Sequence, residues 1–492
     1  MLAKINLLLI SIPLMSLIGL GQISAFDCPS RFGYFPDKVE CTKYYICNFG
    51  IASPQDCPDG LQFSTRLGNC DWKDNVKCAK YNGYAYRDGE DHPPPGTPEV
   101  PTTPGMLLYP LDDPRITEIF AQTQKPKLEV SPAQPCIPSS CQLPNCRCGS
   151  ADPPNVMDPD DIPQMILLTF EGAVTDAAMN IYENTFKDTR KNPNNCPIRA
   201  TYFVSHEWTD YSHVQNLANQ GHEIAVSGIS LQFNRNRSIN SWEDEVLSQR
   251  KVLNEFAKIP VTEIVGMRAP YLSIGGDNQF QMLSNNGFLY DSSMPVSENE
   301  PPFFSFTLDY RINNDCMIDT CPNGSFPGIW EMPLVMWNDR SGDRCNMVDQ
   351  CTDPENQQEV YELLISNFER HYTTNRAPFN IFTSAAWFAK EMNQRAFYDF
   401  LDTVLDKTDQ AKYRNVYFVT MSQAIQWMKK PTTYRDIKTF KPWQCTDTPK
   451  VQPCTKPNTC TPWFEKNKEI RPFKTCRECP KNYPWIGNAY GL

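Results

Sequence analysis

The chain has 492 residues, enough for one large and one smaller domain. Its residues are 40% hydrophobic and 12% aromatic, and this composition argues against global disorder. Its net charge of -11 at pH 7 argues against nucleic acid and anionic membrane surfaces as main partners. An uncharged polysaccharide is compatible with this charge.

The N-terminal residues 1–25 are predicted to be a signal peptide. Lys4 gives a basic start, residues 7–20 are apolar, and residues 23–25 (Ile-Ser-Ala) offer a small-residue cleavage site. A membrane anchor is the weaker interpretation, because the apolar run is short and contains Pro13. No later stretch reaches about 18 apolar residues, so we expect a secreted protein.

Twenty cysteines in an exported chain predict disulfides rather than free thiols or zinc thiolates. Cys476 and Cys479 form a CxxC pair in a Pro-rich tail, and we expect them to bond other tail cysteines. Asn236 and Asn323 each begin a glycosylation sequon, which matters only because export is predicted.

Residues 26–80 form the first predicted domain, a small disulfide-rich β domain. About fifty residues bury little core, so three disulfides would replace packing, and fifteen connectivities are open. The six cysteines are Cys28, Cys41, Cys47, Cys57, Cys70 and Cys78.

Four aromatic residues of this domain are candidates for sugar binding, because a flat ring matches the C–H face of a pyranose. The alternative is that these rings fill the small core. We expect Tyr45 and Phe63 to pack in the core. Tyr44 and Trp72 could equally bind sugar or pack in the core.

Three further segments follow. Residues 81–133 are predicted to be a Pro-rich linker with a weakly patterned continuation. Residues 134–442 form the predicted large domain, which begins with a compact cysteine knot. Residues 443–492 are a cysteine-rich tail that we expect to strap this domain. The knot comprises Cys136, Cys141, Cys146 and Cys148, and the tail contains Cys445, Cys454, Cys460, Cys476 and Cys479.

The large domain alternates buried strands with helical segments. Short apolar runs are typical of parallel strands that are covered on both faces. The alternation predicts a β/α barrel whose working face lies at the C-terminal ends of the strands. The predicted strands are 165–170, 200–204, 222–226, 264–267, 288–290, 329–332, 379–382 and 416–419, and the predicted helices are 177–186, 211–219 and 241–257.

The cysteine spacing of the small domain, C-x12-C-x5-C-x9-C-x12-C-x7-C, resembles the peritrophin-A type of chitin-binding domain. The resemblance implies chitin, or a related N-acetylglucosamine polymer, as the ligand. It also implies the pairs Cys28–Cys47, Cys41–Cys78 and Cys57–Cys70.

The large domain resembles the arthropod chitin deacetylases, which belong to the polysaccharide deacetylases. The resemblance implies a distorted (β/α) barrel of the NodB type and removal of acetyl groups by a divalent metal, usually zinc. It rests on Cys141–Cys148, Ser205–Glu207, Gly221–Val226, Arg268–Leu272, Tyr290–Ser293, Trp330–Pro333 and Ala385–Trp387.

The residues that carry the family chemistry are replaced in this chain. The family's Asp-Asp pair, a base and a metal ligand, reads Glu171-Gly172. The two metal-binding histidines read Ser227 and Leu231, and the histidine that acts as the acid reads Ser384. Glycine and leucine offer no ligand atom and serine is a poor one, so we expect no bound metal.

Other family positions are retained. Arg268 is expected either to pair with Glu171 or to form a structural ion pair, and Asp291 is expected to face Ser384. Three aromatic residues could line a sugar groove or equally pack the core. These are Tyr271, Trp330 and Trp387. A relocated metal site that uses Glu171 and His206 is the weaker interpretation, because too few ligands are present.

The sequence thus predicts a secreted chitin-binding protein of an extracellular matrix, cuticle or gut lining, with an inactive deacetylase-like barrel and no cofactor. The barrel would bind carbohydrate or other matrix proteins. The alternative is an active zinc-dependent deacetylase with an atypical site. Nucleic acid and membranes are not expected as partners.

Overall fold

The computed structural model describes residues in two compact units of the chain. In the first unit it describes residues 26, 33–37, 39–48, 51–57, 61–64, 69–73 and 76. In the second unit it describes residues 130–492 except 233–236, 313–316, 318–319, 353 and 446–450. The expected signal peptide, most of the expected linker, Asn236, Cys28 and Cys78 lie outside the described residues.

The small N-terminal unit consists of short antiparallel strands. One sheet contains β1 (Gly33–Pro36), β2 (Lys43–Asn48) and β3 (Ile51–Asp56), and a hairpin contains β4 (Leu61–Ser64) and β5 (Asn69–Trp72). Cys41 and Cys57 are disulfide-bonded. The sulfur atoms of their partners lie outside the described residues, so the three pairings remain predictions. The predicted disulfide-rich β domain is confirmed.

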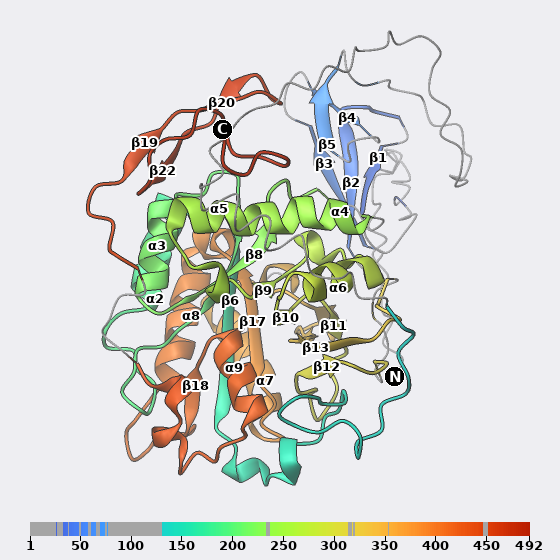
Figure 1. Cartoon of the computed structure of the whole chain (residues 1–492). Helices are drawn as coiled ribbons and strands as arrows, with labels where there is room; N and C mark the ends of the chain where they lie inside the picture. Colours follow the sequence, from blue (N-terminus) through green and yellow to red (C-terminus); the bar gives the residue numbers. More distant parts are fainter. Residues whose placement is uncertain are drawn as a thin grey trace, which may run out of the picture. The chain divides into compact units, whose positions relative to one another are not determined.

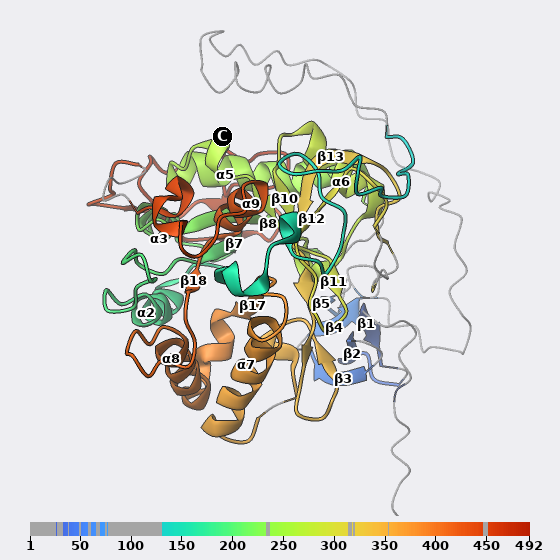
Figure 2. The ribbon, with the colours of Figure 1, turned by 90° about the horizontal axis from the view of Figure 1, so that it is seen from below.

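The large unit is built on one mixed sheet that curves into a distorted barrel (Figure 1, Figure 2). Its strand order is β12-β13-β10-β9-β8-β7-β6-β17, and β18 also pairs with β6. All pairs in this sheet are parallel except β12–β13. The strands are β6 (Gln164–Gly172), β7 (Thr201–Ser205), β8 (Glu223–Gly228), β9 (Gly266–Met267), β10 (Tyr290–Asp291), β12 (Phe306–Leu308), β13 (Phe326–Glu331), β17 (Phe379–Ser384) and β18 (Val416–Phe418).

Helices cover the outside of this sheet, with α3 beside α5 and α7 beside α8 (Figure 1). Their first turns are fixed by side-chain caps, for example Asp210 at α3 and the Thr420–Gln423 capping box at α9. The helices are α2 (Asp176–Thr185), α3 (Tyr211–Asn219), α4 (Ile239–Trp242), the π-helix η3 (Glu243–Leu247), α5 (Ser248–Ala257), α6 (Gly276–Asn285), α7 (Gln357–Tyr372), α8 (Glu391–Val404) and α9 (Met421–Lys429).

Short elements connect the larger ones. The 3-10 turns are η1 (Pro154–Val156), η2 (Pro159–Asp161), η4 (Val261–Glu263), η5 (Pro270–Leu272), η6 (Val348–Gln350), η7 (Ala385–Ala389), η8 (Ile437–Thr439) and η9 (Lys441–Trp443). The paired short strands are β11 (Pro295–Val296) with β14 (Leu334–Val335), β15 (Trp337–Asn338) with β16 (Arg344–Cys345), β19 (Asn458–Cys460) with β22 (Phe473–Thr475), and β20 (Trp463–Phe464) with β21 (Glu469–Ile470).

Both faces of the central strand β6 are buried, which explains its continuous apolar sequence. Ile166, Leu168 and Phe170 pack toward the surrounding helices, while Met165 and Leu167 join a second core cluster inside the barrel. Since side chains alternate along a strand, Thr169 and Glu171 also point into the barrel. The barrel interior thus leads from an apolar floor to a polar mouth.

The predicted disulfide straps are confirmed. Cys136–Cys148 and Cys141–Cys146 close the knot before the barrel, and Cys454–Cys476 and Cys460–Cys479 close the tail. Cys196–Cys445 joins the tail to the barrel. Among the described residues, no helix combines the length and apolar character that a membrane span requires.

Candidate functional site at the barrel mouth

The C-terminal ends of β6, β8 and β17 bring three of the predicted site residues together. Glu171 on β6 lies directly opposite Ser384 on the neighbouring parallel strand. The hydroxyl of Ser227 on β8 donates a hydrogen bond to Glu171 Oε1 over 3.3 Å. The polar mouth of the barrel is therefore centred on Glu171.

Glu171 is held in an unusual environment for a carboxyl group. Its Oε2 atom is shielded from solvent and has no hydrogen-bond partner within the described part of the chain. Burial raises the pKa of Glu171 to about 7, and the nearby positive charge of Arg268 offsets only part of this effect. At neutral pH the carboxyl therefore carries its proton in a large fraction of molecules.

Gly172 is the residue that the resemblance assigns to the position of a metal-binding aspartate. Its φ of +121° is a backbone conformation that L side chains rarely adopt. A Cβ atom at this position would have no described atom within 4 Å. The position thus has room for a side chain, but its backbone favours glycine.

Leu231, which the resemblance assigns to the position of the second metal-binding histidine, follows β8, and the chain around it is held by a carboxylate from the helical layer. Leu231 has a φ of +49°, and its N–H donates to Glu245 Oε1 over 3.0 Å. The N–H and hydroxyl of Ser230 also donate to Glu245, which forms an ion pair with Arg237. Glu245 lies in the π-helix η3, an irregularity that frequently occurs near functional sites.

Ser384 bonds to a residue that the sequence patterns did not single out. Its hydroxyl donates to Asp349 Oδ1 over 2.6 Å, and its N–H donates to Asp349 Oδ2 over 3.2 Å. Asp291 instead accepts hydrogen bonds from Gln279 and Ser293. The prediction that Asp291 faces Ser384 was therefore wrong, because another carboxylate already bonds to Ser384.

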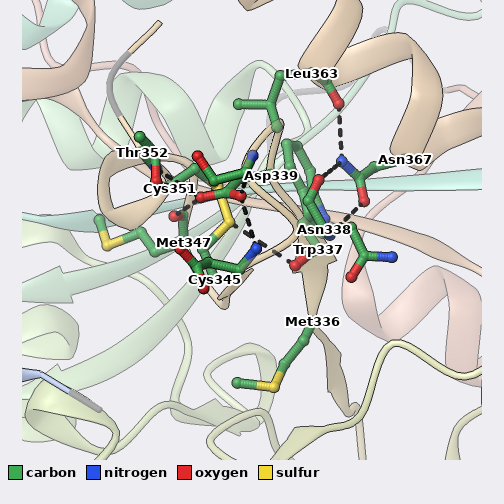
Figure 3. Close-up of a disulfide and its surroundings, with 12 residues drawn as sticks. Met336, Trp337, Asn338, Asp339, Cys345, Met347, Cys351, Thr352, Leu363 and Asn367 are labelled. Atoms are coloured by element: carbon green, nitrogen blue, oxygen red, sulfur yellow. Dashed lines mark hydrogen bonds between the residues drawn. A yellow bond between two sulfur atoms is a disulfide. The ribbon is translucent and has the colours of Figure 1, made fainter. Parts of the chain in front are cut away.

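Asp349 comes from a loop that the Cys345–Cys351 disulfide closes (Figure 3). Asp339 organises the same loop, since its carboxylate accepts the N–H groups of Asp343 and Thr352. The only sequence signal for this arrangement was the short spacing of the two cysteines. No pattern indicated that the loop would reach the end of β17.

Arg268 lies fully buried beneath the mouth. It donates to the carbonyl and hydroxyl oxygens of Ser292 and to Thr169 Oγ1. The ring centroids of Phe203 and Phe382 each lie 4.1 Å from the guanidinium carbon. Among the described residues it forms no ion pair, so both predictions, a pair with Glu171 and a structural ion pair, were wrong.

A pair of buried carboxyl groups lies on the adjoining strands β10 and β13. Asp291 and Glu331 are opposite each other in the parallel register, and their carboxyl groups interact electrostatically. Burial raises the pKa of Asp291 to about 6 and raises that of Glu331 as well. Together with Glu171 they place three carboxyl groups around the single guanidinium of Arg268.

The three predicted groove aromatics differ in exposure. Tyr271 is 54% exposed after β9, and Trp387 is half-buried after β17. Trp330 is fully buried among the side chains of the barrel interior, so of its two expected roles it takes core packing and does not line a groove. An exposed tryptophan at the mouth, Trp208, was not predicted.

The residues at the family's metal position do not fit a metal ion. Gly172 has no side chain, Leu231 has an apolar one, and Ser227 already bonds to Glu171. His206 cannot relocate the site, because its ring nitrogens bond Tyr211 Oη and the carbonyl of Pro484.

Two other clusters of potential ligands occur among the described residues. Cys136, Cys141 and Cys148 are already engaged in disulfides. Asp176, Asp210 and His213 surround the ammonium group of Lys474, which lies 3.3 Å from each carboxylate. The second cluster is therefore an ion-pair network that fastens the tail to α2 and α3.

The aromatic residues of the small domain also differ in burial. Phe63 is only 4% exposed, so its ring packs in the core, as expected from the size of the domain. Tyr44 stacks on Phe63, and Tyr45 stacks on Phe26 at 4.0 Å. Both tyrosines are partly exposed, and the side chain of Trp72 lies outside the described residues.

Comparisons with known proteins agree with both parts of the chain. Residues 28–78 match the family model of the chitin binding Peritrophin-A domain. The chain is 35% identical over 487 residues to chitin deacetylase 1 of Bombyx mori, covering 92% of this chain and 87% of the relative. It belongs to the chitin deacetylase family.

Two further proteins resemble this chitin deacetylase homologue over more than half of its length. Chitin deacetylase 8 of Bombyx mori is 33% identical over 374 residues, which cover 74% of this chain and 95% of that protein. Among solved structures, the catalytic domain of a peptidoglycan N-acetylglucosamine deacetylase from Eubacterium rectale is 14% identical with a TM-score of 0.31, covering 53% of this chain and 90% of that one.

Proposed function

We propose that this chitin deacetylase homologue is a secreted matrix protein whose barrel binds chitin without deacetylating it. The peritrophin-A domain would hold the polymer, and the barrel mouth would offer a second surface. Two weak sites on one chain raise the avidity for a repeating polymer. Other matrix proteins are additional candidate partners of the barrel.

The proposal is supported by the residues that the resemblance assigns to the positions of the metal and the acid, because their side chains are unsuited to these roles. Gly172 supplies no ligand, and Ser384, which stands in the acid's place, donates its own hydrogen to Asp349. General acid catalysis contributes about 10²- to 10⁴-fold, and metal-bound water supplies the nucleophile near neutral pH. A barrel without both groups retains little of the family chemistry.

An active deacetylase is the competing function, and Glu171 is the observation that favours it. Its pKa of about 7 suits a general base, and it has a free buried oxygen within the described part of the chain. Deacetylation by the family's chemistry needs a bound metal ion, whereas chitin binding does not. Measurements with and without metal therefore distinguish the two functions.

The test measures zinc binding and acetate release by the full-length protein. We expect no calorimetric heat on zinc titration and no acetate from N-acetylglucosamine oligomers with added zinc or cobalt. The same oligomers should bind in the absence of metal. Metal-dependent acetate release that is abolished in Glu171→Gln would establish the enzyme instead. A titration that shows only the sites of the peritrophin-A domain, unchanged when Tyr271 and Trp387 are replaced, would indicate that the barrel is a protein-binding scaffold.

A further inference from the structure

An exposed tryptophan stands at the barrel mouth in a backbone conformation that tryptophan rarely adopts. Trp208 lies in the connection between β7 and α3, and its side chain is 58% exposed. The N–H of Thr209 donates to the carbonyl of His206 over 3.2 Å, which closes a four-residue turn. Trp208 takes the third position of this turn with a φ of +67°, where glycine or asparagine is favoured.

The turn is fixed on both sides. His206 is buried and bonds Tyr211 Oη and the Pro484 carbonyl, while the hydroxyl of Thr209 donates to the carbonyl of Ser205 over 2.6 Å. A strained residue persists only where its surroundings hold it, and such strain is concentrated at binding sites. The backbone that carries the indole is therefore held in one conformation, which lowers the backbone entropy that binding would cost.

The C-terminal tail supports this ring from beneath. The guanidinium carbon of Arg471 lies 4.5 Å from the Trp208 ring centroid, and Arg471 itself is 9% exposed. Glu469 and Glu207 pair with Arg471 and hold it in place. One face of the indole thus rests on a buried cation, which leaves the other face for a ligand.

Trp208 continues a series of aromatic residues around the mouth. Tyr271, Trp208 and Trp387 lie three or four residues beyond the ends of β9, β7 and β17. In the order β9-β8-β7-β6-β17 these are every second strand, or steps of roughly 10 Å at the usual strand spacing. In a β-1,4-linked polymer each sugar is flipped relative to the one before it. The same face of the pyranose ring therefore points in the same direction at every second sugar, which matches the spacing at every second strand.

We propose that Trp208, supported by Arg471 of the tail, is a stacking platform for a neutral β-1,4-linked N-acetylglucosamine polymer that crosses the barrel mouth. This inference rests on the proposed function, because it specifies how the barrel holds chitin. Stacking of the indole on a pyranose face needs no charge on the sugar. A neutral polymer therefore suits a ring whose buried face already contacts the cation of Arg471. The tail thereby becomes part of the binding surface.

The test is calorimetric titration of the full-length protein with chitin oligomers, using Trp208→Gly. Glycine suits the positive φ, so this variant should unfold at the same or a higher temperature than the wild type. Its affinity at one class of sites should fall about fivefold, the size of a lost aromatic contact. Tyr434→Ala is the matched control, since Tyr434 is partly exposed and its N–H bonds the carbonyl of Asp161 before the start of β6, at the opposite end of the barrel, so its replacement should leave binding unchanged.

The outcomes separate this inference from the function on which it rests. Two classes of oligomer sites in the wild type, one of them weakened in Trp208→Gly alone, support both. A single class of sites in the wild type overturns barrel binding and the platform with it. Two classes that Trp208→Gly leaves unchanged overturn the platform only. A drop in unfolding temperature without a change in affinity shows that Trp208 is structural.

Discussion

The hydroxyl of Ser384 donates to the carboxylate of Asp349 over 2.6 Å, at the C-terminal end of β17. Asp349 belongs to the loop that Cys345 and Cys351 close, so the bond joins the end of β17 to a constrained segment. In this protein the residue at that position holds a loop against the barrel. Side chains at the mouth are thus hydrogen-bonded to one another, as Ser227 is to Glu171 and Ser384 is to Asp349.

The first prediction concerns Gly172. Gly172→Ala should lower the free energy of unfolding by about 1–3 kcal/mol, because its φ of +121° is strained for any L side chain. No described atom lies within 4 Å of the added Cβ, so a loss of stability would report backbone strain rather than a clash. Urea unfolding with intact disulfides measures it, and an unchanged midpoint would contradict the strain.

The second prediction concerns pH and Glu171. The unfolded carboxyl loses its proton near pH 4.5, whereas the folded one keeps it until about pH 7 because of burial. The folded state therefore binds more protons in this window, and stability falls as pH rises from about 4.5 to about 7, then stays level. Glu171→Gln should remove this loss and gain up to about 3 kcal/mol at pH 8.

Unfolding experiments at pH 4.5 and pH 8 check this prediction. The gain in Glu171→Gln should be present at pH 8 and small at pH 4.5. Glu183→Gln is the control, since Glu183 is exposed on α2 and its replacement should matter at neither pH. An equal gain at both pH values would exclude a titration effect.

The third prediction concerns Arg268. Arg268→Met should cost about 3–5 kcal/mol of stability, because Ser292 and Thr169 lose buried hydrogen bonds and three carboxyl groups lose their nearest cation. Arg395→Met is the comparison, because Arg395 forms an exposed ion pair with Glu391 on α8. That pair should be worth less than about 1 kcal/mol. Similar losses in both variants would argue against a structural role for the buried guanidinium.

The fourth prediction concerns the small domain. A chain lacking residues 26–80 should be retained on insoluble chitin at least about tenfold less than the whole protein, because one of two linked sites is lost. A pull-down at several salt concentrations measures the retained fraction. Equal retention would show that the barrel alone carries the affinity.

The elements of the barrel followed from local patterns in the sequence. The run 165–170 predicted β6 because both faces of that strand are buried, and its apolar residues serve two separate core clusters. The helix expected at 211–219 has the same bounds in the structure, since Asp210 caps its start. The apolar run and the capping residue both lie within, or next to, the element that they predict.

The partners of the mouth residues were harder to predict, because they come from distant segments. Asp349 is 35 residues from Ser384 in sequence, and the loop that carries it has no strand or helix pattern. Arg471 reaches Trp208 from the tail, and nothing in its spacing indicates this. The burial of Trp330 depends on the closure of the whole barrel, which a local pattern does not report.

The backbone at Gly172 also limits which residues the end of β6 can carry. Its φ of +121° suits glycine, and an aspartate introduced there would meet a main chain shaped for glycine. A carboxylate could be of use at this position only after the end of β6 had been rebuilt. A metal site designed into this barrel would therefore have to start from the main chain and not from the side chains.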